Sequence, residues 1–403
     1  MEPAIKLIAG SGRRGRFYAE AMGRLGTETA FEVLARARQL EAQGREVVHL
    51  EIGEPDFDTP RHIVDAAMRS LEAGDTHYVP SAGLPEAREA FAGYLSRMRG
   101  VSYAPSQVVV TPGAKPILFF STLAAVEAGD EVLYPNPGFP IYESMINFVG
   151  AKAVPLRLDP SREFALDLDY LRDAVTPRTR MLILNSPHNP TGGVLSPGDL
   201  AAIAEICREN DLLVFSDEVY SRMHHDGEHA SIVSQEGMLE RTVLLDGASK
   251  SYAMTGWRLG FGAMPEHLAE QVARLATNSV SCTPAFVQKA GIAAVTGPQD
   301  ELDRMLAAFR ERRDAVVAGL NALPGVTCAM PRGAFYAFPD IRETGWPARR
   351  LSQHLLQEGG VALLCGTAFG EWGEGFIRVS YANSLENIRR GLEFMEATLR
   401  KIL

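Results

Sequence analysis

The strongest constraint on the fold of this chain is a series of short apolar runs bounded by turn residues. Runs that are apolar throughout are typical of strands buried on both faces, and the segments between them carry apolar residues at helical spacing. This alternation predicts strands at 107–111, 131–134, 152–158, 180–184, 212–216, 242–245 and 258–263, with helices at 115–128, 197–209 and 265–276. We therefore expect an α/β fold, with a three-layer α/β/α large domain around a mostly parallel seven-stranded sheet.

The pattern changes on both sides of this region. A long charged helix is predicted at 300–323, followed by strands at 333–338 and 376–381 and a closing helix from Leu385. An early helix is predicted at 32–44, and the residues before it show no core pattern. Because 403 residues are many for a single core, we expect an N-terminal arm at 1–30, a large domain at 61–289, and a smaller α+β domain formed by 31–60 and 290–403.

Composition excludes several classes of function. The formal net charge of −10 argues against a nucleic-acid partner, because neutralising phosphates requires an excess of clustered Lys and Arg. No apolar run has transmembrane length and the N-terminus lacks a secretory pattern, so we expect no membrane association and a cytoplasmic location. The four cysteines are far apart in apolar surroundings, which predicts reduced core residues and no metal site.

The segment from Gly247 to Phe261 combines one lysine with an arginine that follows it closely. Lys250 comes just after the predicted strand 242–245, at the end where open α/β sheets bind ligands. A lysine can form a Schiff base with an aldehyde cofactor only when part of its ammonium is deprotonated, and burial lowers its pKa. Arg258 would supply a permanent cation for a cofactor phosphate.

Three other strand ends carry polar residues of the same kind. Asn189 lies in a turn between two prolines, and Asp217 ends an apolar run with Tyr220 three residues later. An aspartate in that place is either a solvated helix cap or the partner of a buried cation, such as the protonated ring nitrogen of pyridoxal phosphate. Gly113 opens a helix whose amides are available to a phosphate, although this motif is weak by itself.

With these four strand ends, the sequence resembles the fold-type I pyridoxal-phosphate enzymes. More closely, it is similar to the class I and II aminotransferase family and its aspartate and aromatic aminotransferase branch, from the segment Ile52 to Asp58 through to the segment Arg378 to Ala382. The resemblance implies a homodimeric enzyme that uses pyridoxal 5'-phosphate. It implies that the enzyme transfers the amino group of an L-amino acid to a 2-oxo acid by a ping-pong mechanism.

The resemblance also implies roles for individual residues. Lys250 would be the Schiff-base lysine and later the base at the substrate α-carbon, with Asp217 as partner of the ring nitrogen and Tyr220 completing the catalytic set. Other cofactor contacts would be made by Asn189 and Tyr220 at the ring oxygen, by Phe139 stacked on the ring, and at the phosphate by Arg258, Gly113, Ala114, Lys115 and Tyr78 of the neighbouring subunit. Substrate contacts would be made by Gly53, Asn189 and Arg378 at the α-carboxylate.

Some features depart from this pattern or suggest other functions. Gly247 replaces a phosphate-binding serine of some members, which leaves open whether Ser249 contacts the phosphate, and no residue matches a cation for a second substrate carboxylate. A lyase or decarboxylase on the same fold is the alternative enzyme. A transcription regulator is the non-enzyme alternative, and we expect too few residues before Thr29 for a winged helix. The dinucleotide-like run 10–15 and the histidine-rich run 224–229 are interpreted as chance similarity and a solvated loop.

Overall fold

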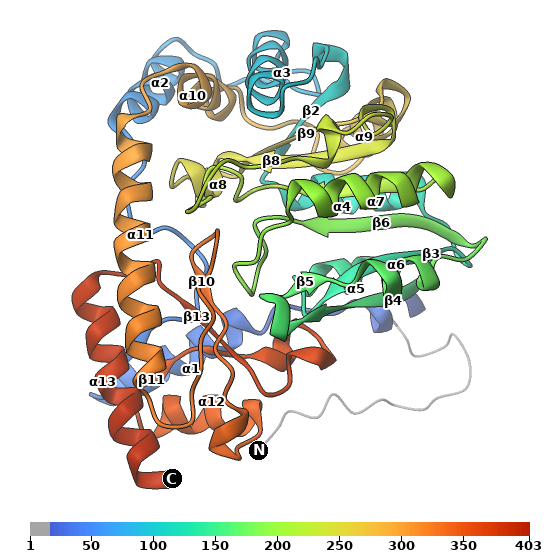
Figure 1. Cartoon of the computed structure of the whole chain (residues 1–403). Coiled ribbons are helices and arrows are strands. Elements are labelled where there is room, and N and C mark those ends of the chain that lie inside the picture. Colours follow the sequence, from blue (N-terminus) through green and yellow to red (C-terminus); the bar gives the residue numbers. More distant parts are fainter. Residues whose placement is uncertain (1–16) are drawn as a thin grey trace.

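The computed structural model describes residues 17–403, so the dinucleotide-like run 10–15 lies outside the described residues. An eight-stranded sheet runs through the large part of the molecule (Figure 1) in the order β2-β9-β8-β7-β6-β3-β4-β5. Seven of its strands match the predicted ones, namely β2 (Val108–Pro112), β3 (Glu131–Asn136), β4 (Lys152–Asp159), β6 (Thr179–Asn185), β7 (Leu213–Asp217), β8 (Thr242–Gly247) and β9 (Leu259–Ala263). The eighth, β5 (Ala165–Leu166), is an edge strand of two residues, too short to produce an apolar run.

The sheet is mostly parallel, as predicted. Strands β4, β3, β6, β7 and β8 pair in parallel, whereas β9 runs antiparallel between β8 and β2. The parallel strands therefore present their C-terminal ends, including Asn185, Asp217 and Gly247, at one edge of the sheet. Arg258 immediately precedes β9 instead of beginning it, because its backbone is left-handed with φ of 59°.

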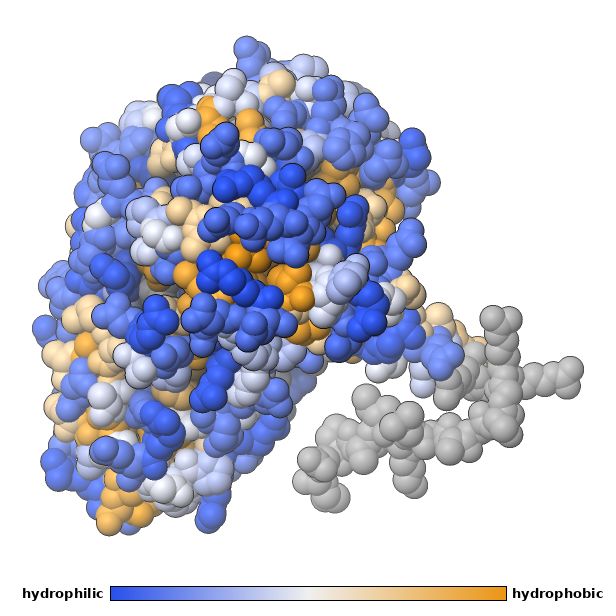
Figure 2. Space-filling model, turned by 45° about the vertical axis from the view of Figure 1, so that its right-hand side comes forward, coloured by the Kyte–Doolittle hydropathy of each residue, from blue (hydrophilic) through white to orange (hydrophobic). Residues whose placement is uncertain are grey.

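Alternating side chains of the strands enter two different cores. Val109, Phe215 and Val243 pack beneath α4 (Lys115–Ala125), α5 (Ile141–Val149) and α9 (Glu266–Thr277). Their neighbours, such as Val214 and Leu244, pack with α3 (Pro85–Arg99), α6 (Leu168–Ala174) and α7 (Pro197–Glu209) on the other face. This arrangement confirms the three-layer α/β/α prediction. Figure 2 accordingly shows a face that is mostly hydrophilic, with hydrophobic side chains confined to patches.

A second group of elements combines both ends of the chain. Strand β1 (Val48–His49) pairs in parallel with β11 (Val361–Ala362), and β13 (Ile377–Ser380) lies between β10 (Tyr336–Ala337) and β12 (Leu364–Cys365). The helices of this group are α1 (Ala30–Ala42), α11 (Asp300–Asn321), α12 (Ala348–Gln357) and α13 (Leu385–Ile402), as Figure 1 shows. The long α11 leads into this group from the sheet-containing part.

The predicted domain limits stay a prediction. Residue 290 falls inside α10 (Ala285–Thr296), which packs against α2 (Arg61–Glu72) and α3. Ahead of α1, the short helix η1 (Glu20–Arg24) buries none of its side chains. Within residues 17–403, every helix is too short or too polar to cross a lipid bilayer.

The histidine-rich run is a loop, as predicted, and its residues 226–228 are exposed, but two of its histidines are not solvated. His225 is buried, and its Nε2 lies 2.8 Å from the carbonyl oxygen of Ala334. The side chain of His229 is also enclosed and pairs with Glu218 at 2.8 Å. These histidines find their partners in other parts of the fold, at the Ala334 carbonyl and at Glu218, which sequence polarity alone does not reveal. The described part of the chain has no cluster of three His, Cys, Asp or Glu side chains suited to a metal.

Candidate active site

A cavity of about 720 Å³ opens at the C-terminal ends of the parallel strands. It lies where the elements of the second group meet the sheet edge, because residues from α1, β10 and β13 line it together with the ends of β6, β7 and β8. Ten predicted site residues line this one cavity, namely Gly53, Ala114, Lys115, Phe139, Asn189, Asp217, Tyr220, Lys250, Arg258 and Arg378. Residues far apart in the sequence thus converge at the ligand-binding edge of an open α/β sheet.

Lys250 reaches this cavity from α8 (Ala248–Ser251), the single helical turn that follows β8. Its Nζ donates a hydrogen bond to the carbonyl oxygen of Gly53. The residue as a whole is partly buried, but its ammonium is enclosed deeply enough for desolvation to lower its pKa to about 8. Glu54 opposes this shift and the cation of Arg378 adds to it. A substantial fraction of the amine is therefore neutral in the physiological pH range.

Asp217 is held in the cavity wall by two residues that the sequence did not single out. The Tyr142 hydroxyl donates to Asp217 Oδ2 at 2.7 Å, and Asn185 Nδ2 donates to the Asp217 carbonyl at 3.0 Å. Burial raises the pKa of Asp217 to about 6, although the hydrogen bond from Tyr142 acts in the opposite direction and lowers this pKa. A buried carboxylate of this kind needs a cationic partner to remain ionised at low cost. In sequence, Tyr142 looks like any core tyrosine of an amphipathic helix.

Arg258 lines the cavity at a corner where it packs tightly against Gly113, which is not itself part of the lining. Gly113 has φ of 90°, and a Cβ placed on it would lie 2.2 Å from Arg258 Nη2, so the guanidinium occupies the space that any side chain there would need. Arg258 Nη1 is fixed by the carbonyl of Thr255 at 2.8 Å. Next to it α4 begins at Lys115, whose N–H has no partner within the helix. A fixed cation beside a helix N-terminus is suited to a phosphate.

Arg378 is buried on β13 and its hydrogen bonds fix its orientation. Its Nη1 donates to Asn189 Oδ1 at 3.0 Å and its Nη2 to the Glu51 carbonyl at 2.6 Å. Its buried Nε has no hydrogen-bond partner within residues 17–403. Burial lowers the pKa of the guanidinium, which nonetheless stays charged because an arginine pKa is so high. An unsatisfied buried donor on a fixed cation is suited to an anionic ligand group.

The remaining predicted residues differ in their placement. Phe139 lines the cavity with its ring 5.6 Å from that of Tyr142, and Lys115 directs its ammonium toward Glu28 and the Phe139 ring. Tyr78 does not line the cavity: it is 90% exposed. Its predicted role at a neighbouring subunit's site is therefore not tested by a single chain.

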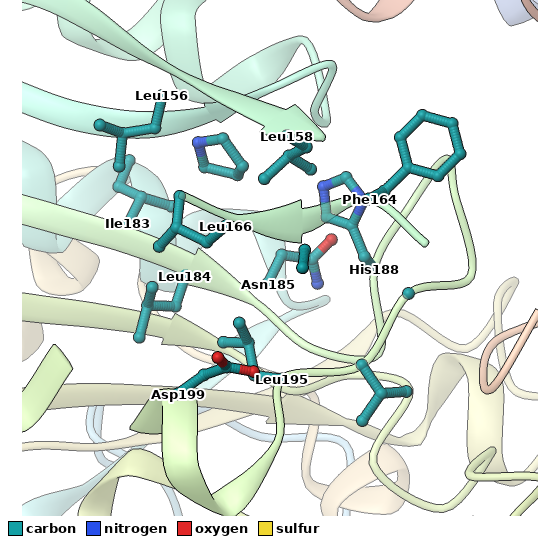
Figure 3. A pocket seen from close by; sticks show the side chains of 14 residues that line it. Leu156, Leu158, Phe164, Leu166, Ile183, Leu184, Asn185, His188, Leu195 and Asp199 are labelled. Carbon is teal, nitrogen blue, oxygen red and sulfur yellow. The ribbon is translucent and has the colours of Figure 1, made fainter. Parts of the chain in front are cut away.

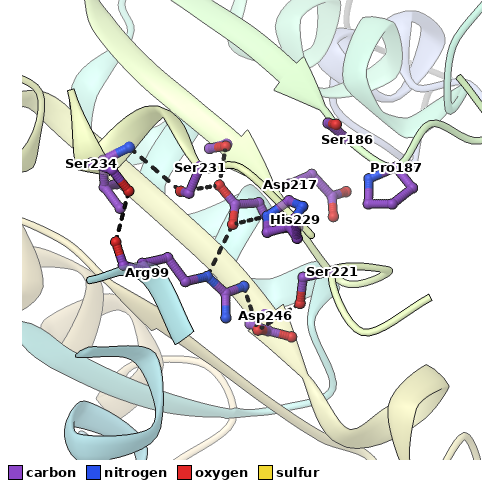
Figure 4. A network of polar contacts seen from close by, with 12 residues as sticks. Arg99, Ser186, Pro187, Asp217, Ser221, His229, Ser231, Ser234 and Asp246 are labelled. Atoms are coloured by element: carbon purple, nitrogen blue, oxygen red, sulfur yellow. Dashed lines mark hydrogen bonds and ion pairs between the residues drawn. The ribbon is translucent and has the colours of Figure 1, made fainter. Parts of the chain in front are cut away.

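A buried polar network lies behind the cavity and was also missed from sequence (Figure 4). Arg99, on α3, pairs with Glu218 at 3.0 Å and Asp246 at 2.7 Å. Glu218 additionally accepts hydrogen bonds from His229 and Ser231. Burial by itself raises the pKa of Glu218, but His229 and Arg99 together outweigh it and lower the pKa to about 2. The network therefore ties α3 to the strand ends that carry Asp217 and the turn to Lys250.

A second cavity, of about 40 Å³, lies between β4, β5 and β6 (Figure 3). Its walls are mostly apolar side chains, with leucine the commonest, and the buried ring of His188 lies at one side. Burial lowers the pKa of His188 to about 3, so the ring is neutral, and its Nδ1 lies 2.8 Å from Thr191 Oγ1. None of the predicted catalytic residues lines this cavity, which has room for little more than water.

Comparisons with known proteins agree with this site. The family model "Aminotransferase class I and II" matches residues 45–395. The aspartate aminotransferase of Pyrococcus abyssi is 40% identical over 361 residues, covering 89% of this chain and 92% of the relative. The aromatic-amino-acid aminotransferase 2 of Thermococcus litoralis is 39% identical, covering 89% and 94%. The solved aspartate aminotransferase of Thermus thermophilus with maleate is 37% identical with a TM-score of 0.91, covering 95% of this chain and all of that one.

These matches confirm that the chain is an enzyme and a transaminase, as the sequence motifs predicted, and they do not favour the lyase alternative. Pyridoxal phosphate is the cofactor that the family implies. The substrates that the family implies are an amino acid and a 2-oxo acid. Because the family model and the relatives each span most of its length, this chain belongs to the class I and II aminotransferases.

Proposed function

We propose that the large cavity holds pyridoxal 5'-phosphate and that Lys250, Asp217 and Tyr220 are its catalytic residues. The observation that carries this proposal is the position of the Lys250 amine, whose pKa is about 8, in the same cavity as Asp217 and Arg378. An amine that is partly neutral is needed for covalent attachment to an aldehyde and for proton transfer. Lysines with their ammonium in bulk water do not meet this condition.

The donors and acceptors of the cavity fit the chemical groups of this cofactor. Asp217 is a buried carboxylate that would pair with a ring N–H, and Phe139 offers an aromatic face. Arg258 and the amides at Gly113, Ala114 and Lys115 would hold the phosphate. Because Gly113 has no side chain, the Arg258 guanidinium can pack directly against its backbone. Asn189 and Tyr220 would donate to the ring oxygen. The Asn189 amide has its oxygen engaged by Arg378, which leaves its N–H groups available.

When bound, pyridoxal phosphate supplies an aldehyde that condenses with amines and a pyridinium ring that accepts electron density from the substrate α-carbon. The residues of the chain then have distinct tasks. Asp217, when ionised, would pair with the ring nitrogen and favour its protonated form. Lys250 Nζ would take the proton from the substrate α-carbon and pass it to the cofactor carbon, and would return it in the opposite sense in the second half-reaction. The Gly53 carbonyl, already bonded to Lys250 Nζ, would help to aim the amine.

Arg378 and its neighbours would bind the α-carboxylate of both substrates. The unsatisfied Nε and the fixed Nη groups give a charged, oriented donor set, and Gly53 and Asn189 lie on either side of it in the cavity. A carboxylate held there would direct the α-carbon toward Lys250. Both an L-amino acid and a 2-oxo acid carry this group, so one anchor serves the two half-reactions of a ping-pong cycle.

We further propose that the enzyme works as a homodimer in which Tyr78 reaches the phosphate of the partner's cofactor. Support comes from the large exposed side chains of the N-terminal segment and of Tyr78 itself, since apolar groups left open on one chain mark association surfaces. Sedimentation velocity should give a dimer. Tyr78→Phe should weaken cofactor binding without changing the dimer, and unchanged cofactor affinity would contradict the role of Tyr78. The cytoplasmic location stays a prediction.

The activity is tested by incubating the purified protein with pyridoxal phosphate, a panel of L-amino acids and a 2-oxo acid acceptor. We expect a new 2-oxo acid and a new amino acid in equal amounts, with product exceeding the amount of cofactor only when the acceptor is present. Product that exceeds the amount of cofactor in the absence of an acceptor would instead indicate a lyase. Lys250→Ala should abolish turnover, while Lys152→Ala, which removes a largely exposed lysine far from the cavity lining, should not.

A further inference from the structure

Tyr336 is a buried cavity residue that no sequence motif singled out. It lies on β10, which pairs with the strand β13 that carries Arg378 (Figure 1). Its side chain makes two different contacts in the site. The hydroxyl lies 2.8 Å from the hydroxyl of Tyr220, and the guanidinium of Arg378 lies 4.4 Å from the centre of its ring. One side chain therefore touches a proposed cofactor contact and the proposed substrate anchor.

We infer that Tyr336 is a positioning residue: its hydroxyl directs the proton of Tyr220 toward the cofactor, and its ring orients Arg378 for the substrate carboxylate. The inference rests on the proposed function, because Tyr336 would act only through Tyr220 and Arg378. Tyr336 itself is assigned no contact with the cofactor or the substrate. It adds to that function a physical link between the two halves of the site.

The role of the hydroxyl follows from counting protons. Each tyrosine carries a single hydroxyl proton, and neither hydroxyl has another hydrogen-bond partner in the part of the chain that the structure describes. If Tyr220 gives its proton to a ligand oxygen, the 2.8 Å contact can persist only with Tyr336 as the donor. Burial raises the pKa of both phenols, so both remain protonated across the working pH range. The pair then forms a chain of donors that ends at the ligand.

The role of the ring follows from the surroundings of Arg378. The guanidinium packs against two aromatic rings, 4.4 Å from the centre of Tyr336 and 4.8 Å from that of Phe369. Its hydrogen bonds to Asn189 and to the Glu51 carbonyl fix its edges, while the rings fix its plane. A planar cation confined in this way loses little freedom when it binds a carboxylate.

The backbone on the other side holds Tyr336 in this position. A Cβ placed on Gly53 would lie 2.1 Å from the Tyr336 hydroxyl oxygen, so the glycine backbone packs directly against the phenol. The ring also packs against Phe335, with centroids 4.8 Å apart, and the side chain is 1% exposed. The hydroxyl therefore has little room to turn away from Tyr220.

Two substitutions of Tyr336 separate its two roles. Tyr336→Phe removes the hydroxyl and keeps the ring, whereas Tyr336→Leu removes both. Tyr220→Phe alone, and combined with Tyr336→Phe, completes a double-mutant cycle. Tyr381→Phe is the matched control, since it deletes another buried hydroxyl, bonded to the Ala334 carbonyl at 3.2 Å, outside the cavity lining. Thermal unfolding of each variant checks that the fold is retained.

Two measurements report on the inference. The first is the pH midpoint of the absorbance change of the protein loaded with pyridoxal phosphate, which responds to hydrogen bonds at the ring oxygen. Tyr336→Phe should raise it by about 0.5 to 1 unit, the equivalent of one hydrogen bond. The second is kcat and KM for an amino donor: Tyr336→Phe should leave KM within about twofold, and Tyr336→Leu should raise it roughly tenfold.

The outcomes are distinct. The shift from Tyr336→Phe should vanish in the Tyr220→Phe background, and Tyr381→Phe should cause none. A midpoint unmoved by Tyr336→Phe, or moved equally in the absence of the Tyr220 hydroxyl, would overturn the role of the hydroxyl. A KM for Tyr336→Leu equal to that of Tyr336→Phe would overturn the role of the ring. A wild-type protein that fails to bind pyridoxal phosphate would instead refute the proposed function.

Discussion

Asp217 gives the sharpest prediction, because its carboxylate costs stability in the protein without a ligand. Burial raises its pKa from 3.8 to about 6. Between these values the folded protein binds more protons than the unfolded chain, so stability falls as the pH rises through this window. The full shift corresponds to about 3 kcal/mol, of which about 2 kcal/mol is lost between about pH 4.5 and 7.5.

The substitution Asp217→Asn removes this titration and keeps an oxygen that accepts from Tyr142. Any hydrogen bond lost from the Val219 amide costs about 1 kcal/mol, but that cost does not depend on pH. We therefore expect the free energy of unfolding of the variant, minus that of the wild type, to increase by about 2 kcal/mol from about pH 4.5 to 7.5. Other carboxylates cancel in this difference because both proteins contain them.

The assay is urea denaturation of the cofactor-free proteins at a series of pH values. Tyr142→Phe is the matched variant: it removes the donor to Asp217 Oδ2, so the pKa of Asp217 should rise further and the decline should extend to higher pH. Adding pyridoxal phosphate should make the wild type more stable than Asp217→Asn. The cationic ring nitrogen of the cofactor would compensate the charge of the wild-type carboxylate, whereas the amide of the variant has no charge to pair with it. Parallel stability curves for wild type and Asp217→Asn would refute the reasoning.

Three further predictions concern the cavity and the network behind it. The rate at which pyridoxal phosphate attaches covalently to the cofactor-free protein should rise with pH toward about 8 as Lys250 loses its proton, and a rate that is flat from about pH 6 to 9 would contradict that pKa. Gly53→Ala should lower kcat/KM at least tenfold with the fold retained, because its Cβ would lie 2.1 Å from the Tyr336 hydroxyl; kinetics equal to wild type would show that this contact yields freely. Arg99→Met should lower the free energy of unfolding by about 3 to 5 kcal/mol in denaturant melts, because two buried carboxylates lose the arginine that pairs with them. The control is Arg97→Met, which replaces an exposed arginine on the same helix and should cost less than about 0.5 kcal/mol.

Much of the fold followed from local pattern. The predicted strand 212–216 begins with four consecutive apolar residues, and such runs become parallel strands wherever helices cover both faces. The edge strand β5 escaped prediction because two residues carry no periodicity. The placement of Arg258 before β9 also escaped prediction, because its left-handed backbone has no signal in the local sequence.

The sequence by itself determined which residues could do the chemistry, because a lysine, an aspartate and two arginines in specific motifs suffice to name a cofactor class. Only the tertiary structure decided how these residues are tuned. Tyr142, Tyr336 and Arg99 act through contacts with residues at least 75 positions away, and nothing in their own neighbourhood distinguishes them from ordinary core or helix residues. Burial is a property of the whole fold, and it is burial that lowers the pKa of Lys250 and raises that of Asp217.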